Sequence, residues 1–174
     1  MLSIDLNLLT KEQFIELVNY IYKRCDRFSI SIPNFQQKGC GDKMKMNKFF
    51  RVYMETIKPI YDDIEPHVIY KRITKKYMNS KYSHAMEVKV AKLYKGFKQI
   101  LLENGCFWNW QYPDMPEDLC FFLGKKCWML TISHEEVCFI YEETKEDIEM
   151  LEKNNILYDK YIDLGDGSAP TYKE

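Results

Sequence analysis

One stretch, residues 106–141, constrains the fold more than any other part of the chain. It holds short apolar runs separated by polar and turn residues, at 119–123, 127–132 and 137–141. Runs of this length that are rich in aromatic and β-branched residues are typical of strands. The first link, Gly124 with Lys125, suits a two-residue hairpin because glycine tolerates positive φ, and residues 133–135 form the second link. The stretch therefore predicts an antiparallel β-meander.

The N-terminal region predicts a helix, a strand, a loop and a second helix. Thr10 and Gln13 have the spacing of a capping box, so the first helix is expected to start at Lys11. Residues 27–32 alternate apolar and polar side chains, which is the period of a half-buried strand. Residues 34–47 lack such a pattern and predict an exposed loop. Residues 48–61 predict the second helix, which Pro59 would kink or end.

The C-terminal two thirds predict further helices around the meander. Ile69, Ile73 and Tyr77 recur at intervals of four, which predicts a helix over 66–78. An apolar stripe predicts a long helix over 80–103, closed by Gly105. Thr144 is expected to cap a short helix at 145–153, and residues 156–158 are a candidate strand. The fold class is therefore α+β, with a small, mainly antiparallel sheet packed against the long helix and the N-terminal helices.

Composition sets the scale of this fold. With 174 residues, of which 46% are hydrophobic, the chain is long enough for one core, so a single domain is expected over 1–164. Residues 165–174 are rich in Gly, Ser and Pro and predict a flexible tail. The opening residues lack a basic, apolar leader, and no later apolar run is long enough to span a bilayer, which favours a cytoplasmic protein. The six cysteines are then expected to be free thiols.

Aromatic and acidic residues in the C-terminal half suggest a protein-binding surface. Trp108, Trp110 and Tyr112 alternate with polar residues, and aromatic anchors of this kind, together with Trp128, are typical of protein interfaces. A base-stacking role is disfavoured because the charges that follow are acidic. Glu146 and Asp147 belong to an acidic cluster that would steer a basic partner. The structural alternative is that the aromatic residues pack in the core and that the acidic ones favour the start of a helix.

The sequence offers one alternative acid–base site. Ser133, His134, Glu135 and Glu136 bring a hydroxyl, an imidazole and two carboxylates together. His134 with Glu135 or Glu136 would act as acid and base if a cleft lay above the meander. A polar turn between two strands needs such residues in any case, because their side chains hydrogen-bond the local backbone.

A metal site is the weakest of the candidates. Zinc prefers thiolate and imidazole ligands, which are present in this region as Cys120, Cys127, His134 and Cys138. Structural zinc sites pair ligands two to four residues apart, whereas whole strands separate these. We therefore expect no metal and no other cofactor, with the cysteines buried as small hydrophobic residues.

Basic residues gather in the region 71–98, although the net charge of the chain is only −1. On the predicted helices they would form basic faces able to bind nucleic acid, with binding that weakens steeply with salt. The ordinary reason for such faces is solvation of a surface helix. The near-neutral total charge also counts against nucleic acid.

The last third of the chain resembles a group of small proteins. The matching residues are PEDLCFF at 116–122, then Gly124, KCW at 126–128 and SHEE at 133–136. They resemble small proteins of low-GC Gram-positive bacteria, some labelled sporulation-like and some identified as immunity proteins of polymorphic toxin systems. The resemblance implies a bacterial protein and does not choose between the two labels; the immunity label implies a protein that binds and neutralises a toxin. Together with the missing catalytic motifs, it predicts a non-enzymatic protein-binding module.

Overall fold

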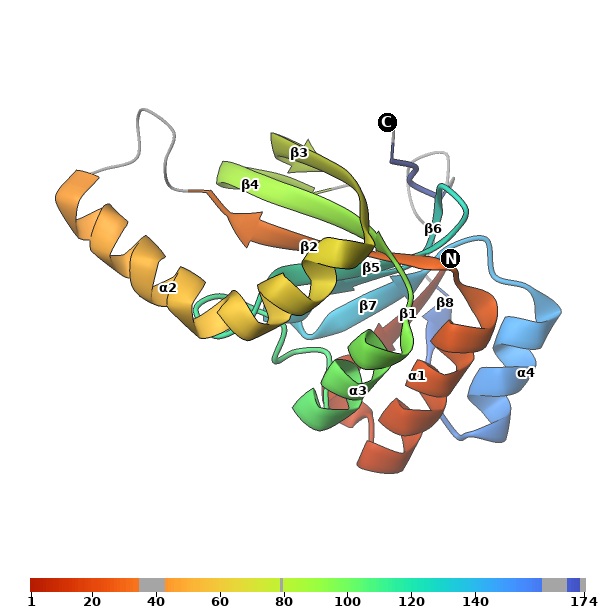
Figure 1. The fold of residues 1–174 in the computed structure, drawn as a ribbon. Helices are drawn as coiled ribbons and strands as arrows, with labels where there is room; N and C mark the ends of the chain where they lie inside the picture. The colour runs from red at the N-terminus through yellow and green to blue at the C-terminus, as the bar shows by residue number, and fades with distance from the viewer. Residues whose placement is uncertain (35–42, 79, 161–168, 173–174) are drawn as a thin grey trace.

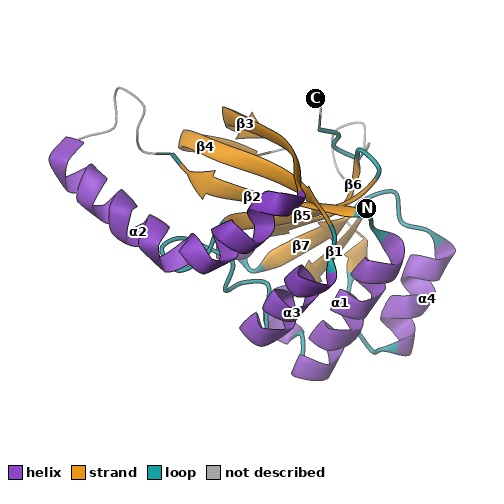
Figure 2. Ribbon diagram, viewed as in Figure 1, coloured by secondary structure: helices purple, strands orange, loops and turns teal. Residues whose placement is uncertain are grey.

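The computed structural model describes residues 1–34, 43–78, 80–160 and 169–172, and this part of the chain is an α+β fold with one eight-stranded antiparallel sheet and four α-helices (Figures 1 and 2). The strands run in the order β3-β4-β2-β5-β6-β7-β1-β8. Their bounds are β1 Leu2–Asp5, β2 Arg27–Pro33, β3 Val68–Tyr77, β4 Ser80–Lys92, β5 Glu117–Leu123, β6 Lys126–Ile132, β7 Val137–Ile140 and β8 Asp159–Lys160. The helices are α1 Lys11–Arg24, α2 Lys43–Ile64, α3 Lys95–Asn104 and α4 Lys145–Lys153, with 3-10 turns η1 Leu6–Leu8, η2 Glu65–His67 and η3 Ser133–Glu135.

The predicted helix caps are confirmed. The Thr10 hydroxyl accepts a hydrogen bond from the Gln13 backbone amide at 3.2 Å, and the Gln13 side chain accepts one from the Thr10 amide at 2.9 Å. Thr144 and Asp147 make the same reciprocal pair at the start of α4. Gly105 ends α3 with φ 78°, the left-handed conformation that glycine adopts without steric cost.

The predicted helices at 66–78 and 80–103 are wrong over most of their length. Residues 68–77 and 80–92 form strands β3 and β4, and only the last part of the second segment is helical, as α3. A spacing of four residues, as between Ile69 and Ile73, places side chains on one face of a helix and also on one face of a strand. Alternation at Met86, Val88 and Val90 was the signal for a strand, and all three are buried.

The meander is confirmed as β5, β6 and β7, paired antiparallel in sequence order. The strand 27–32 is confirmed as β2, but it is buried on both faces and not half-buried, since Ser29 and Ser31 are fully buried at the centre of the sheet. The helix 48–61 is part of the longer α2, which contains Pro59. α2 begins at Lys43 inside the predicted loop 34–47, of which residues 35–42 lie outside the described part of the chain. The short strand expected at 156–158 lies slightly later, as β8.

The sheet has two different faces. All four helices lie on one face, where their apolar side chains form the main core with the inward side chains of the sheet (Figure 1). On the other face the sheet residues form a second apolar cluster that includes Tyr172, near the C-terminus. Tyr172 is 3% exposed, and its ring packs edge-on against Phe122 at 5.2 Å. Residues 169–172 of the expected tail therefore pack on the sheet.

Candidate partner-binding groove

Two of the predicted aromatic anchors lie in the core. Trp110 is 0% exposed and its ring is 5.5 Å from that of Phe97 on α3, while Trp128 is 3% exposed and contacts Tyr20 on α1. Neither side chain is available to a partner in this structure. The alternation of aromatic and polar residues therefore marks a side chain that packs in the core at Trp110, and not a contact for a partner. The loop that carries Trp110 packs against α3.

The other two aromatic residues of the segment, Trp108 and Tyr112, are half-buried. Tyr112 packs against Tyr53 of α2 with ring centroids 5.0 Å apart, and the Tyr53 hydroxyl donates to the Met115 carbonyl at 3.3 Å. These contacts fix the 112–115 loop against α2. They bring the Met115 side chain, which is half-buried, to the place where α2 and α3 meet.

A groove of about 650 Å³ lies there. α2 contributes its last turns, α3 contributes one face along its length, and Met115 completes the lining. Ile60, Ile100 and Met115 give the groove its apolar floor. The exposed Val52 lies seven residues, about two turns, before Pro59 and so extends the apolar surface along the same side of α2.

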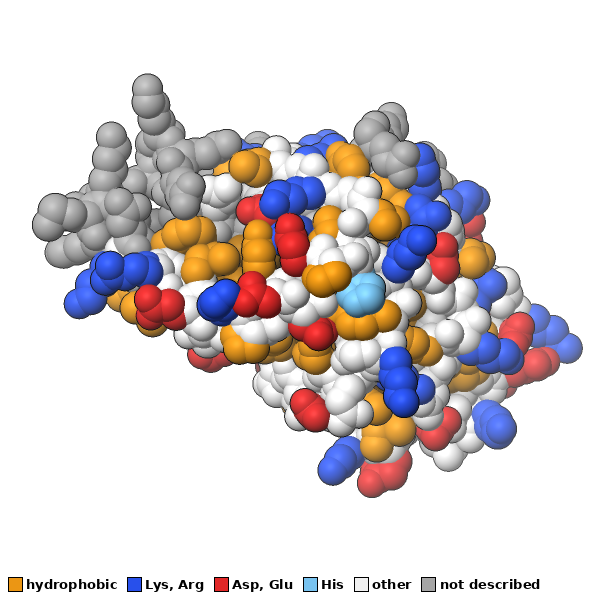
Figure 3. Space-filling view, viewed as in Figure 1, with side chains coloured by type: hydrophobic (Ala, Val, Ile, Leu, Met, Phe, Trp, Pro, Cys, Tyr) orange, Lys and Arg blue, Asp and Glu red, His pale blue; other side chains and the backbone are white. Residues whose placement is uncertain are grey.

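Carboxylates stand at both ends of this groove. Asp63 lies at the end near the start of α3, where one of its carboxylate oxygens is 3.5 Å from the point that a Cβ on Gly96 would occupy. This carboxylate accepts a hydrogen bond from the Tyr94 hydroxyl at 2.5 Å. Glu103 is exposed in the last turn of α3 and accepts from Gln99 at 2.8 Å. Positions 96 and 103 are about 10 Å apart along a helix, so the groove presents two acidic ends around an apolar floor. Figure 3 shows hydrophobic and acidic side chains side by side over this region.

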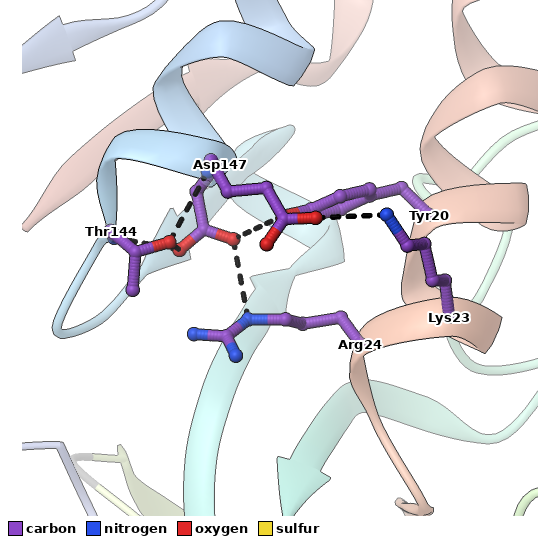
Figure 4. A network of polar contacts seen from close by, with 6 residues as sticks. Tyr20, Lys23, Arg24, Thr144 and Asp147 are labelled. Atoms are coloured by element: carbon purple, nitrogen blue, oxygen red, sulfur yellow. Dashed lines mark hydrogen bonds and ion pairs between the residues drawn. The ribbon is translucent and has the colours of Figure 1, made fainter.

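The two predicted acidic contacts on α4 differ in exposure. Glu146 lies on the surface, with its carboxylate 2.8 Å from Lys23. Asp147 is fully buried between α4 and α1 and accepts hydrogen bonds from Tyr20 at 2.8 Å and from the Thr144 amide at 2.7 Å, with Arg24 3.3 Å away (Figure 4). Asp147 therefore holds α4 to α1 and is not part of an open surface.

Most of the remaining acidic cluster is paired as well. Glu142 lies 2.9 Å from Lys126, Glu149 lies 3.2 Å from Lys145, and Glu143 lies 2.9 Å from the terminal amino group of Met1. Each pair reduces the field that a distant cation would experience. The carboxylates of the α2–α3 groove, Asp63 and Glu103, are therefore better placed to attract a basic partner than the acidic residues in and before α4 that the sequence analysis proposed.

The structure places the alternative acid–base residues on the open turn η3. His134 is 64% exposed and its Nε2 lies 3.8 Å from the Glu135 carboxylate, which is itself exposed. Two carboxyls that no sequence pattern singled out, the buried Asp118 and the half-buried Glu117, lie close to this turn. Burial raises the pKa of Asp118, and a hydrogen bond from Tyr82 at 3.1 Å opposes that increase. Burial and the neighbouring Asp118 charge also raise the pKa of Glu117.

The cysteines suggested as zinc ligands are divided between the two cores. Cys120 and Cys127 lie in the cluster on the helix-free face, whereas Cys138 lies in the main core under the helices. Burial raises the pKa of the Cys127 and Cys138 thiols. Among the described residues, no three His, Cys, Asp or Glu side chains lie close enough together to share a metal ion.

The predicted basic helical faces do not form, because residues 71–92 are mostly strand. Lys89 is 0% exposed, forms a close ion pair with Glu65, and has its ammonium 3.3 Å from the centre of the Tyr61 ring. Lys71 lies 3.2 Å from Glu87. These two cations are therefore neutralised within the fold and are not available to a nucleic-acid backbone.

No protein-family model matches this chain, and no curated protein or solved structure is significantly similar to it. No helix in the described part of the chain combines the length and the apolar character needed to cross a membrane.

Proposed function

We propose that this chain is a non-enzymatic protein-binding module and that the α2–α3 groove is its partner site. The observation that carries the proposal is the combination of an apolar floor, formed by Ile60, Ile100 and Met115, with carboxylates at both ends. The partner is then a basic protein segment that places an aliphatic side chain between two cations. The resemblance of the C-terminal third to immunity proteins favours a toxin domain as that basic partner.

The rise along α3 between Gly96, beside Asp63, and Glu103 suggests the form of the partner segment. Positions 96 and 103 are separated by about 10 Å, which is also the rise between residues i and i+7 of a helix. An amphipathic helix with Lys or Arg at i and i+7, and Leu or a similar residue at i+3 or i+4, matches this pattern. Its aliphatic side chain would contact Met115, and its two cations would lie beside Asp63 and Glu103.

The position of Glu103 supports a binding role because the fold does not require it. A carboxylate in the last turn of a helix interacts unfavourably with the helix dipole. Glu103 is exposed and its side chain accepts one bond, from Gln99, so stability alone does not account for it. Asp63 also lies in the last turn of a helix, α2, but it is close to the start of α3 and accepts a hydrogen bond from Tyr94, so the fold gives it a partner there.

A charge reversal with a matched control tests the proposal. Glu103→Lys reverses the charge at one end of the groove. Glu152→Lys makes the same change at an exposed glutamate in the last turn of α4, which likewise accepts one side-chain bond, from Tyr158 at 3.2 Å. Both changes relieve an unfavourable dipole interaction, so neither is expected to unfold the protein.

The assay is affinity capture from the native lysate with the wild type and both variants, followed by affinity measurement with the captured protein. We expect a basic protein that binds the wild type and Glu152→Lys equally and is lost from Glu103→Lys. A Met115→Ser variant, which makes the floor polar, should also weaken binding. A partner retained by Glu103→Lys and Met115→Ser would contradict this site.

A further inference from the structure

Strand β3 leaves one long edge of the sheet open. It is the first strand in the sheet order and pairs only with β4 among the described strands. Backbone groups alternate in direction along a strand, so about half of the amides and carbonyls of β3 point away from β4. Figures 1 and 2 show β3 as the outermost strand, above β4.

Part of this edge is closed by the strand itself. Near its C-terminal end, the Lys76 carbonyl accepts from Arg72 at 3.0 Å and from the Thr74 hydroxyl at 2.8 Å, and the Lys76 amide donates back to Thr74 at 3.1 Å. The pairing with β4 is also irregular between Thr74 and Lys76, and a second irregularity lies between Val68 and Tyr70. The edge that the strand does not close with its own side chains is therefore residues 68–73, which span about 20 Å and include the second irregularity.

The side chains of the open edge differ between the two faces of the sheet. On the face toward α2, Ile69 and Ile73 are 41% and 51% exposed, although both are large aliphatic side chains. On the other face lies Arg72, beside a hollow of about 290 Å³ that is also lined by Lys76 and Tyr172. The Arg72 Nε atom is buried and has no hydrogen-bond partner in the described part of the chain.

The positive charge of β3 favours an acidic partner over a second copy of the strand. The strand has the sequence VIYKRITKKY, with four cations and no carboxylate. Lys71 is paired with Glu87 across the strands, whereas Arg72, Lys75 and Lys76 have no carboxylate partner among the described residues. A second copy of β3 would bring four further cations alongside, and like charges on adjacent strands are destabilising. An acidic strand would instead gain from the three cations that have no carboxylate partner.

We propose that the 68–73 edge of β3 adds an extended segment of a partner protein in which acidic and aliphatic residues alternate. The added strand would pair with the open backbone groups, which supply affinity, while alternate side chains supply specificity. Its acidic side chains would face Arg72 and Lys76, and its aliphatic side chains would cover Ile69 and Ile73. This surface is separate from the α2–α3 groove, so each is tested independently.

The test uses a fluorescein-labelled, capped peptide of three Glu-Val repeats titrated against the full chain and followed by anisotropy. Three peptides serve as comparisons: Lys-Val repeats, Glu-Val repeats N-methylated at alternate residues, and a scrambled sequence with the glutamates adjacent. We expect Glu-Val binding below about 1 mM that weakens with salt, and at least about tenfold weaker binding of the other three.

Protein variants locate the site. Arg72→Gln keeps a donor and removes the charge, and is expected to weaken binding about fivefold. Ile69→Ser/Ile73→Ser removes the aliphatic contacts and should weaken it further, whereas Leu157→Ser, at a 70% exposed leucine elsewhere, should not. Glu103→Lys in the groove should leave peptide binding unchanged.

Four outcomes would overturn the proposal. They are no binding of the Glu-Val peptide at about 1 mM, equal binding of the N-methylated peptide, equal binding by the β3 variants, and a wild-type dimer in sedimentation that the Ile69→Ser/Ile73→Ser variant abolishes. The last result would identify a second copy of the chain as the occupant of the edge.

Discussion

Adjacent carboxylates on α4 should differ greatly in their contribution to stability. Asp147→Ala removes a fully buried group that accepts bonds from Tyr20 and Thr144 and lies 3.3 Å from Arg24. Loss of a helix cap costs about 1 kcal/mol, and a hydrogen bond to a charged group contributes about 1.5–3 kcal/mol. Removing one partner of a buried ion pair costs about 3–5 kcal/mol. These contributions overlap, so we expect a total of about 4 kcal/mol.

Glu146→Ala is the control, because Glu146 is exposed and its pair with Lys23 contributes about 0.2–1 kcal/mol. Urea unfolding followed by tryptophan fluorescence, with m-values compared among the proteins, gives both free energies. For a chain of this size the Asp147→Ala loss corresponds to a fall in Tm of about 8–16 °C. A difference between the two variants of less than about 1 kcal/mol would refute the structural role of Asp147.

Three further predictions concern other parts of the fold. Tyr172→Ala should destabilise the protein by about 3 kcal/mol in urea, since the ring packs against Phe122, and an unchanged midpoint would place the C-terminal segment off the sheet. Because burial raises the folded-state pKa of Asp118, the folded state binds the proton more tightly and stability should fall as the pH rises above about 4. Asp118→Asn, which keeps an acceptor for Tyr82, should flatten that fall above about pH 4. A variant whose stability falls with pH in parallel with the wild type would contradict the assignment. The five cysteines other than Cys40 are buried free thiols, so a Cys40→Ser variant should react slowly with a thiol reagent until the protein is unfolded. Fast reaction of the folded variant would disprove the burial of these thiols.

The parts of the fold that local sequence signals specify were predictable. The caps at Thr10 and Thr144 and the glycine end of α3 depend on residues within one turn of each other, and the meander depends on short links. β3 and β4 were harder to predict, because side chains four residues apart share a face in a helix and also in a strand. In β4 the alternation at Met86, Val88 and Val90 is a local strand signal, whereas β3 depends on pairing across the sheet, such as Arg72 with Val88, which is not a local contact.

The candidate site was harder to predict than the fold. Trp110 and Trp128 have the residue type of anchors, but Trp110 is buried by the packing of the loop after α3 and Trp128 by the packing of α1 on β6. The groove joins residues from α2, α3 and Met115, which are far apart in the sequence. Glu103 precedes Asn104 and Gly105 at a helix end, where a carboxylate is unfavourable. Glu152 shows the same mismatch at the end of α4, so this local feature does not by itself locate the groove.

The central claim is that the α2–α3 groove binds a basic protein, and the affinity of the captured partner for Glu103→Lys tests it most directly. Titration calorimetry at about 0.1 M salt would compare wild type, Glu103→Lys and Glu152→Lys. Replacing an attraction by a repulsion at contact distance should change the binding free energy by about 2 kcal/mol, and so weaken Glu103→Lys by about thirtyfold while Glu152→Lys stays near wild type. Equal affinities for all three proteins would contradict the claim.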